Sequence, residues 1–168
     1  MIDATKRNDQ KAVPKTKTKK KMKLCLISSS GGHYEELLML KPLEEKYDLF
    51  WVTEKVGYQS AVDYYLAQTG LKDGLMFLKM LWNCIKTVFI WIKERPQAVV
   101  TTGSMVALPA CFLAKIFGKK VIFIETFARV QDCTRAGKLA YKIADLFIYQ
   151  WESLEKFYPE GVYGGSIF

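Results

Sequence analysis

The sequence predicts an α/β fold in which parallel strands form a doubly wound, Rossmann-like sheet. Apolar runs of strand length alternate along the chain with segments that carry apolar residues at helical spacing. At two places a strand is followed directly by a small loop of serine and glycine and then by a helix. This repeated order of strand, loop and helix is typical of parallel sheets with crossover helices.

The expected elements follow from apolar runs and from the prolines and glycines that separate them. Strands are expected at 24–27, 47–53, 98–102, 119–124 and 146–150. Helices are expected from His33 to about residue 40 and at 59–68, 73–95, 105–117 and 137–144, with a short amphipathic piece at 152–158. Pro42 interrupts or restarts the first helix, and Pro96 stops the helix before it. Gly118 is the expected C-cap of the helix at 105–117.

The positive charge of the chain is concentrated at its start. Of the formal net charge of +8, residues 1–21 contribute six, from eight Lys or Arg against two Asp. This tail has few apolar residues and is expected to be disordered, which leaves residues 22–168 as a single domain. The tail is either attracted to anionic lipid headgroups or is a solvated leader before a natural start at Met22. It lacks the apolar stretch of a signal peptide.

Four cysteines and one histidine restrict the metal chemistry that the chain can support. Cys25, Cys84, Cys111 and Cys133 form no C-x-x-C pair, and three of them lie in apolar runs. They are expected to be free thiols in a reducing cytosol. Because His33 is the only histidine, a His-rich metal site is not expected, and neither a metal nor a cofactor is assigned to the chain.

Three loops are expected to meet at one edge of the sheet. The first, SSSGGH, runs from Ser28 to His33, and its glycines would let a phosphate approach the backbone at the start of a helix. It could also be a simple tight turn, since it has neither the G-x-G-x-x-G pattern nor the P-loop Lys-Ser/Thr pair. Residues 102–104 and 125–129 also follow strands. All three loops therefore belong to the carboxyl ends of the strands, where ligands of such sheets bind.

The segment 73–95 is an apolar helix with a narrow polar stripe. Lys79, Lys86 and Lys93 recur every seven residues and share the stripe with Asn83 and Glu94. The lysines argue against a transmembrane helix. One face is expected on the core and another against lipid or a partner, the alternative being burial on all sides. The expected membrane-binding residues are Leu78, Lys79, Trp82, Lys86, Phe89, Trp91 and Lys93.

The last ten residues, PEGVYGGSIF, form an apolar segment that carries three glycines. The segment either pairs into the sheet or awaits another polypeptide. Its residues expected to dock a partner chain are Tyr163, Ile167 and Phe168.

Three separated motifs resemble a family of glycosyltransferase subunits. They are SSSGGHYEELL, TTGSMVALP and IETFARVQDCTRAGKLAYKIADLFIYQWESL, and the resemblance covers residues 22–168. The family comprises the membrane-associated, acceptor-binding subunits of split inverting glycosyltransferases. It includes the eukaryotic asparagine-linked-glycosylation UDP-GlcNAc transferase subunit and bacterial capsule or exopolysaccharide proteins. More distantly, the chain is similar to the N-terminal half of the lipid II synthase that adds GlcNAc in peptidoglycan assembly.

The resemblance implies a fold equivalent to the N-terminal half of a GT-B glycosyltransferase. A second small protein would form the other half and bind the UDP-sugar. The chain would hold a polyprenyl-diphosphate-linked sugar at the cytoplasmic face of the plasma membrane and would be inactive alone. In the bacterial version, the acceptor would be an undecaprenyl-diphosphate sugar and the donor UDP-galactose or UDP-GlcNAc.

The resemblance further implies that two glycine-bearing loops hold the acceptor diphosphate. The implied binding residues are Ser30, Gly31, Gly32, His33, Thr102, Gly103, Ser104 and Arg129. The chain departs from its distant relative in two ways. Residues 28–30 replace a more glycine-rich loop, and residues 102–104 carry one glycine where that relative has two.

An inverting transfer requires a base near the acceptor hydroxyl, and Glu125 and His33 are the candidates. Glu125 could instead cap the next turn or pair with Arg129, and His33 could cap its helix. Arg129 could clamp phosphate or bind Asp132. Glu35 and Glu36 are most simply explained as first-turn carboxylates favoured by the helix dipole.

Two other classes of function compete with a transferase subunit. The chain could be a non-catalytic adaptor that anchors and activates a complete glycosyltransferase at the membrane. It could also be a stand-alone nucleotide-binding enzyme. Nucleic-acid binding would depend only on the Lys-rich tail, because no groove-reading module accompanies it, so no nucleic-acid partner is expected.

Overall fold

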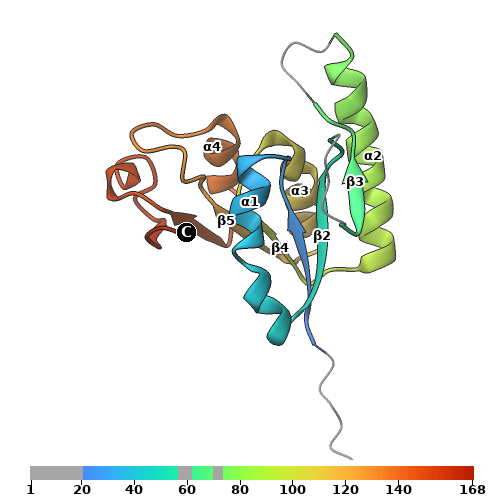
Figure 1. Ribbon diagram of the computed structural model, residues 1–168, viewed down its shortest axis with the longest axis horizontal. Coiled ribbons are helices and arrows are strands. Elements are labelled where there is room, and N and C mark those ends of the chain that lie inside the picture. Colours follow the sequence, from blue (N-terminus) through green and yellow to red (C-terminus); the bar gives the residue numbers. More distant parts are fainter. Residues whose placement is uncertain (1–20, 57–61, 70–73) are drawn as a thin grey trace, which may run out of the picture.

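A computed structural model describes residues 21–56, 62–69 and 74–168 and shows one parallel sheet with helices on both faces (Figure 1). Its strands run in the spatial order β3-β2-β1-β4-β5-β6-β7, and every pairing is parallel. The strands are β1 Lys23–Ile27, β2 Asp48–Glu54, β3 Tyr64–Leu66, β4 Ala98–Thr101, β5 Lys120–Ile124, β6 Leu146–Tyr149 and β7 Val162–Tyr163. This arrangement confirms the doubly wound α/β fold.

The helices are α1 Gly32–Leu38, α2 Met76–Glu94, α3 Leu108–Ile116 and α4 Arg135–Tyr141. Short 3₁₀ turns cover Lys41–Glu45, Met105–Ala107 and Glu152–Leu154. The helix α1 ends at Leu38, and Pro42 lies in the first residues of the 3₁₀ turn that follows it, in agreement with a helix that restarts there. Gly118 follows α3 with a φ of +63°, as a C-cap requires.

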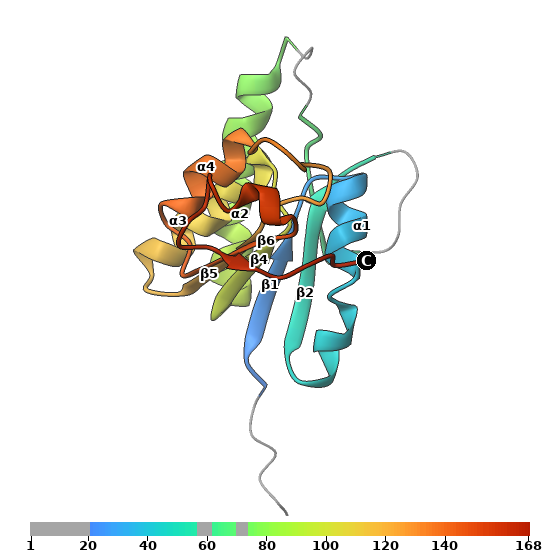
Figure 2. The same ribbon diagram turned by 90° about the vertical axis from the view of Figure 1, so that its left-hand side faces the viewer.

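Side chains of successive strand residues pack on opposite faces of the sheet. On β1, Leu24 and Leu26 pack with Leu37 of α1, whereas Cys25 and Ile27 belong to the core under α2 and α3. Figure 2 shows α1 on one side of the sheet and α2, α3 and α4 on the other. Because both faces are covered, the central strands are apolar throughout and carry no exposed polar face.

The region between β2 and α2 differs from the sequence prediction. A helix was expected at 59–68, but Tyr64–Leu66 forms the edge strand β3, paired with β2; residues 57–61 lie outside the described part of the chain. Tyr64 packs edge-on against Phe50, with ring centroids 6.0 Å apart. Aromatic residues favour a pleated, half-buried surface, so tertiary packing outweighs the local helical pattern here.

The C-terminal segment pairs into the sheet, as one of the two alternatives predicted. β7 extends the sheet beyond β6, and the Gly164 N–H donates to the Tyr149 carbonyl oxygen at 2.9 Å. The tail of residues 1–20, with its predicted affinity for lipid, lies outside the described residues.

The side of α2 that faces the sheet carries polar residues together with the apolar Ile90 and Trp91. Asn83 is buried and bonds through its amide to the backbone N–H and carbonyl oxygen of Ala67, at 2.7 and 2.8 Å. Glu94 accepts hydrogen bonds from Lys23 and Tyr64. Asn83 and Glu94 of the predicted polar stripe therefore bind residues of the sheet and of the segment that follows β3.

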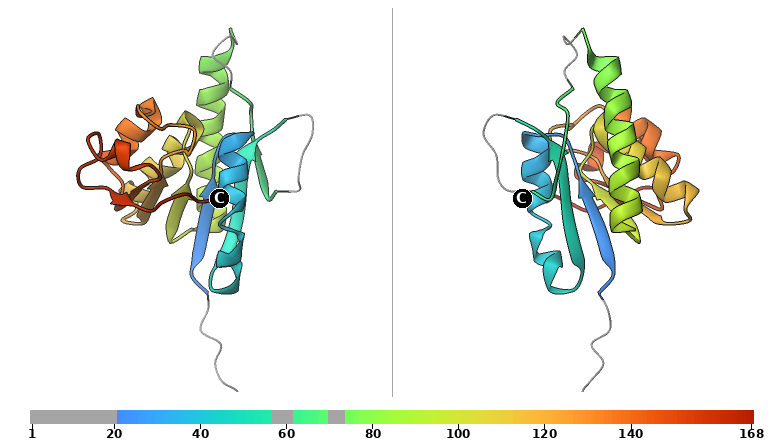
Figure 3. Two further views of the ribbon diagram at one scale, coloured as in Figure 1. Left: turned by 60° about the vertical axis from the view of Figure 1, so that its left-hand side comes forward. Right: turned by 90° about the vertical axis from the view of Figure 1, so that its right-hand side faces the viewer.

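The opposite face of α2 is apolar and exposed. Figure 3 shows this long helix on the side of the molecule away from α1. The apolar face of α2, as we call it, consists of Phe77, Leu78, Leu81, Trp82, Ile85, Val88, Phe89 and Ile92. No helix within the described residues has the length and hydropathy needed to cross a membrane.

The two tryptophans of α2 lie on different sides. Trp91, predicted to bind the membrane, is only 7% exposed and stacks on Phe117 with centroids 5.9 Å apart. Trp82 is 58% exposed. The sequence could not separate the two because apolar residues occur all around this helix.

Replacing each tryptophan by alanine tests this orientation. Trp91→Ala should lower the free energy of unfolding by about 3–5 kcal/mol, because it leaves a cavity beneath α2. Trp82→Ala should change it by less than about 0.5 kcal/mol. Urea unfolding followed by circular dichroism measures both. Equal effects would show that the helix is rotated from the orientation described.

Candidate functional site

The centre of the sheet is a topological switch point, where the chain order of the strands reverses. β1 lies between β2 and β4, and the loops at residues 28–31 and 102–104 leave the carboxyl ends of the neighbouring strands β1 and β4. Ligands of open α/β sheets bind in the crevice outside these ends. The two loops predicted to hold a ligand therefore leave the sheet side by side.

Two hydrogen bonds join these loops directly. The Thr102 hydroxyl donates to the His33 carbonyl oxygen at 2.5 Å, and the His33 Nδ1 lies 2.9 Å from the Thr102 carbonyl oxygen. A carbonyl oxygen only accepts, so Nδ1 carries the proton. The neutral ring then keeps its lone pair on Nε2, the nitrogen that can accept a proton.

Backbone conformation explains the glycines of both loops. Gly31 and Gly103 have φ values of +78° and +113°, a region in which side chains are strained. A Cβ atom on Gly103 would lie 3.2 Å from the His33 ring. The close approach of β4 to His33 therefore depends on a glycine at this position.

Ser104 is unusual in its backbone and in its side chain. Its φ of +81° and ψ of +155° fall in a region that glycine occupies almost exclusively. Its hydroxyl oxygen is buried and has no hydrogen-bond partner within the described residues. Strain of this kind costs about 1–3 kcal/mol and is typical of functional loops.

Further buried oxygens without a partner gather at the same edge of the sheet. Within the described part of the chain, the buried side-chain oxygens that lack a hydrogen bond belong to Ser28, Glu36, Thr53 and Ser104. Ser28 and Ser104 follow β1 and β4, Thr53 is near the end of β2, and Glu36 is on α1 above them. Native proteins seldom leave buried polar atoms unpaired, so this edge suits a polar ligand.

The third loop joins the first through a carboxylate that the sequence prediction did not single out. The Glu36 Oε1 accepts from the Thr126 hydroxyl and from the Phe127 N–H, both at 2.8 Å. All three predicted loops thus meet at one place. The sequence signal for Glu36 was its position one turn after His33, on the same side of α1.

Glu125 does not occupy the place expected of a catalytic base. Its side chain is 0% exposed, and its carboxylate accepts hydrogen bonds from Thr134, Tyr158 and the Thr126 N–H. A Cβ on Gly137 would lie 2.0 Å from its Oε2, so the helix α4 packs directly on it. The geometry contradicts contact with an acceptor and gives Glu125 a structural role, in which it ties both ends of the loop 126–134.

Arg129 lies on the exposed turn of that loop. Its guanidinium pairs with Asp132 at 2.8 Å, which is one of the two alternatives predicted, and no phosphate role follows from this geometry. Sequence reasoning missed Thr134 and Tyr158. Burial and the bond to Glu125 raise the pKa of Tyr158, so its hydroxyl stays protonated and donates.

The residues predicted to dock a partner lie at the edge of this same loop. The Ile167 N–H donates to the Gln150 side chain, which in turn donates to the Glu125 carbonyl oxygen at 3.0 Å. Tyr163 and Phe168 are exposed, and the Phe168 ring packs edge-on against Phe127. The C-terminal segment is thereby connected to the site.

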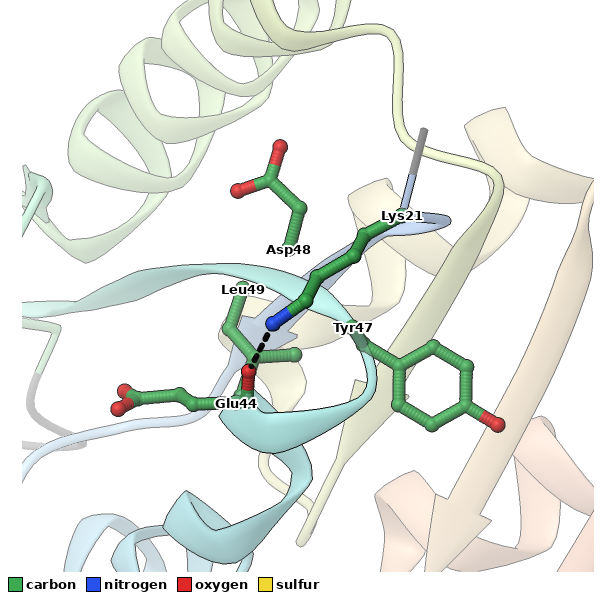
Figure 4. Close-up of a pocket in the computed structure, with 5 residues that line it drawn as sticks. All are labelled: Lys21, Glu44, Tyr47, Asp48 and Leu49. Atoms are coloured by element: carbon green, nitrogen blue, oxygen red, sulfur yellow. Dashed lines mark hydrogen bonds between the residues drawn. The ribbon is translucent and has the colours of Figure 1, made fainter. Parts of the chain in front are cut away.

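A separate hollow of about 410 Å³ lies at the opposite end of the strands, where β2 begins (Figure 4). Lys21 crosses it and donates to the Glu44 carbonyl oxygen at 2.8 Å. Since it opens at the amino ends of the strands, it is not part of the switch-point site. No cluster of three His, Cys, Asp or Glu side chains suited to a metal occurs within residues 21–56, 62–69 and 74–168.

Comparison with known structures places this fold beside GT-B enzymes. The chain superposes on MurG from Acinetobacter baumannii with a TM-score of 0.61 at 17% identity, covering 77% of this chain and 41% of that one. It superposes on UDP-N-acetylglucosamine 2-epimerase from Rickettsia bellii with a TM-score of 0.66 at 16% identity, covering 83% and 42%. The chain thus spans about two fifths of each and matches the N-terminal half of a GT-B glycosyltransferase.

Comparison of sequences identifies the family. The chain is 35% identical over 180 residues to the protein named "UDP-N-acetylglucosamine transferase subunit ALG14" of Rattus norvegicus, covering 86% of this chain and 82% of that protein. Residues 67–167 match the family model described as "Oligosaccharide biosynthesis protein Alg14 like". The chain therefore belongs to the Alg14-like family of oligosaccharide biosynthesis proteins.

Proposed function

We propose that this chain is the acceptor-binding subunit of a two-chain inverting glycosyltransferase. It holds a polyprenyl-diphosphate-linked sugar at the cytoplasmic face of a membrane, while a partner subunit carries the UDP-sugar. The observation that carries the proposal is the junction of the His33 and Thr102 loops at the switch point, lined by buried oxygens without partners. Its relatives are named as transferase subunits, which supports a partner subunit in the enzyme.

The diphosphate of the acceptor suits the two loops. Positive φ angles at Gly31 and Ser104 bring backbone N–H groups of both loops to where an anion can approach them, while the Gly103 N–H is held by the Thr101 hydroxyl at 3.1 Å. The unpartnered Ser104 hydroxyl offers one further donor. Arg129, on the exposed turn, would reach phosphate only by leaving Asp132.

His33 is the base in this proposal. Its Nε2 takes the proton of the acceptor hydroxyl, whose oxygen forms a bond to the anomeric carbon of the donor sugar. The bond from that carbon to the diphosphate oxygen breaks, and UDP leaves with the electron pair. Thr102 fixes the ring for this step because its carbonyl oxygen holds the proton of Nδ1.

The apolar face of α2 is the proposed membrane contact. Its exposed aromatic and aliphatic side chains would insert among the acyl chains at the surface of an anionic membrane. Lys79, Lys86 and Lys93 lie on the same helix and can meet lipid phosphates. In Figure 1 the first turns of α2 extend past the carboxyl ends of the strands, on the side of the loops.

A non-catalytic adaptor is the second candidate. Burial of Glu125 favours it, since one of the two predicted bases is absent from the site and His33 alone remains. If the chain were an adaptor, the glycosyltransferase that it anchors would keep its activity when His33 is replaced. The next experiment separates the two functions.

His33→Gln tests the base. In the complex with its co-expressed partner subunit, the rate of sugar transfer to a polyprenyl-diphosphate-linked acceptor should fall by about 10²–10⁴-fold, because no group remains to take the proton. Glu35→Gln, a change of an exposed neighbour on α1, should keep most of the rate. Product is measured by chromatography of the lipid-linked sugar. Wild-type transfer by His33→Gln would favour the adaptor.

Ser104→Gly tests whether strain is held at the diphosphate site. Glycine accepts the positive φ, so the variant should be more stable than wild type by about 1 kcal/mol in urea unfolding. It should nevertheless raise KM for the acceptor, since a hydroxyl donor is lost. Ser29→Gly, at a residue without positive φ, should not stabilise the chain. A stabilised variant with unchanged KM would remove Ser104 from the binding site.

Vesicle sedimentation tests the membrane contact. Trp82→Ser combined with Phe89→Ser should weaken binding to anionic phospholipid vesicles by about tenfold or more, because each buried aromatic contributes about 1.5–3 kcal/mol. The assay is run at raised ionic strength, which screens any attraction between the basic residues 1–21 and the anionic lipid headgroups. The matched control changes Leu139 and Phe157, exposed apolar residues away from α2, to serine. Undiminished binding by the α2 variant would exclude this face as the anchor.

A further inference from the structure

Glu36 is a buried carboxylate at the meeting point of the three loops. Its side chain is 3% exposed, whereas the adjacent Glu35 faces solvent. Two first-turn carboxylates that only interact with the helix dipole would both be exposed. The interpretation of Glu35 and Glu36 as such carboxylates therefore holds for Glu35 only. Taking a carboxylate out of water is costly, and its position calls for a functional or structural reason.

The two oxygens of Glu36 have different surroundings. Oε1 accepts two hydrogen bonds, from the Thr126 hydroxyl and the Phe127 N–H. Oε2 is buried and has no hydrogen-bond partner within the described residues. The loop contact therefore uses one oxygen and leaves the second with its charge uncompensated by any donor.

His33 is the titratable residue that lies nearest to Glu36 along α1 on the same side of the helix. It precedes Glu36 by one turn of α1, and both side chains point to the carboxyl edge of the sheet, toward β4 and the end of β5. The pKa of Glu36 is raised, chiefly by burial, although the hydrogen bonds from Thr126 and Phe127 act to lower it. Arg129 is engaged by Asp132, and Glu35 points to solvent.

We propose that Glu36 is a positioning residue for His33, which deepens the proposed function and rests on it. The Glu36 carboxylate stabilises the positive ring that forms when Nε2 takes the acceptor proton. It also holds the turn at 126–127 against α1, which keeps the loops joined.

Glu36→Gln separates charge from shape. The glutamine oxygen can still accept from Thr126 and Phe127, but the negative charge is gone. In the reconstituted complex, kcat should fall about 10- to 100-fold while KM for the acceptor stays within about twofold. The acidic limb of the kcat/KM profile should move to lower pH, because a protonated base is no longer stabilised.

Two matched variants complete the experiment. Glu35→Gln removes an equal charge from an exposed position and should leave kcat and the acidic limb unchanged. Glu36→Asp keeps the charge, so its acidic limb should match wild type even if its hydrogen bonds lengthen and kcat falls. If Glu36→Gln does not fold, Glu36→Asp tests the proposal instead. An acidic limb of its kcat/KM profile that lies at a different pH from that of wild type would overturn the proposal.

The outcomes distinguish this inference from the function on which it rests. If His33→Gln transfers sugar at the wild-type rate, the proposed function fails. If His33 is required for transfer but Glu36→Gln has the acidic limb of wild type, only the role of Glu36 is rejected. The same conclusion follows if Glu35→Gln shifts the acidic limb as much as Glu36→Gln does. A loss of thermal stability in Glu36→Gln without a change in the limb would make it a structural residue.

Discussion

The reciprocal contact between His33 and Thr102 is the constraint on which the site depends. It joins the first turn of α1 to the end of β4 at the one place where the strand order reverses. The contact requires Gly103, because a larger residue there would press on the imidazole ring. One pair of hydrogen bonds thus brings two loops 69 residues apart together, and at the same time sets which ring nitrogen holds the proton.

Two buried carboxylates then place the third loop. Glu125 binds both ends of residues 126–134, and Glu36 binds its first residues from across the crevice. The two carboxylates differ in their hydrogen bonds. Both oxygens of Glu125 accept hydrogen bonds, whereas Oε2 of Glu36 has no partner within the described residues. A fully bonded carboxylate fixes a loop, whereas a half-bonded one beside a histidine can also act on that histidine's charge.

Much of the fold could be predicted from the sequence, because buried parallel strands are continuous apolar runs and prolines and glycines mark the ends of helices. The positions of the three loops followed from the same pattern. The orientation of α2 did not, since apolar residues surround it and only packing against Phe117 decides that Trp91 is buried. β3 depends on pairing with β2, and the burial of Glu125 and Glu36 depends on contacts from distant segments. Such contacts leave no local signal.

The exposed apolar face of α2 connects the site to the membrane contact that we propose. The side of α2 that packs on the sheet carries Asn83 and Glu94 beside the buried Ile90 and Trp91, and the other apolar residues of the helix face outward. A helix that merely needed to pack on the sheet would present its apolar side to the core, and exposing so many large side chains is unfavourable unless another surface covers them. The first turns of α2 extend past the carboxyl ends of the strands, so the proposed membrane contact lies at the same end of the molecule as the loops. The orientation of α2 thus places an apolar exterior at the same end of the molecule as the polar loops.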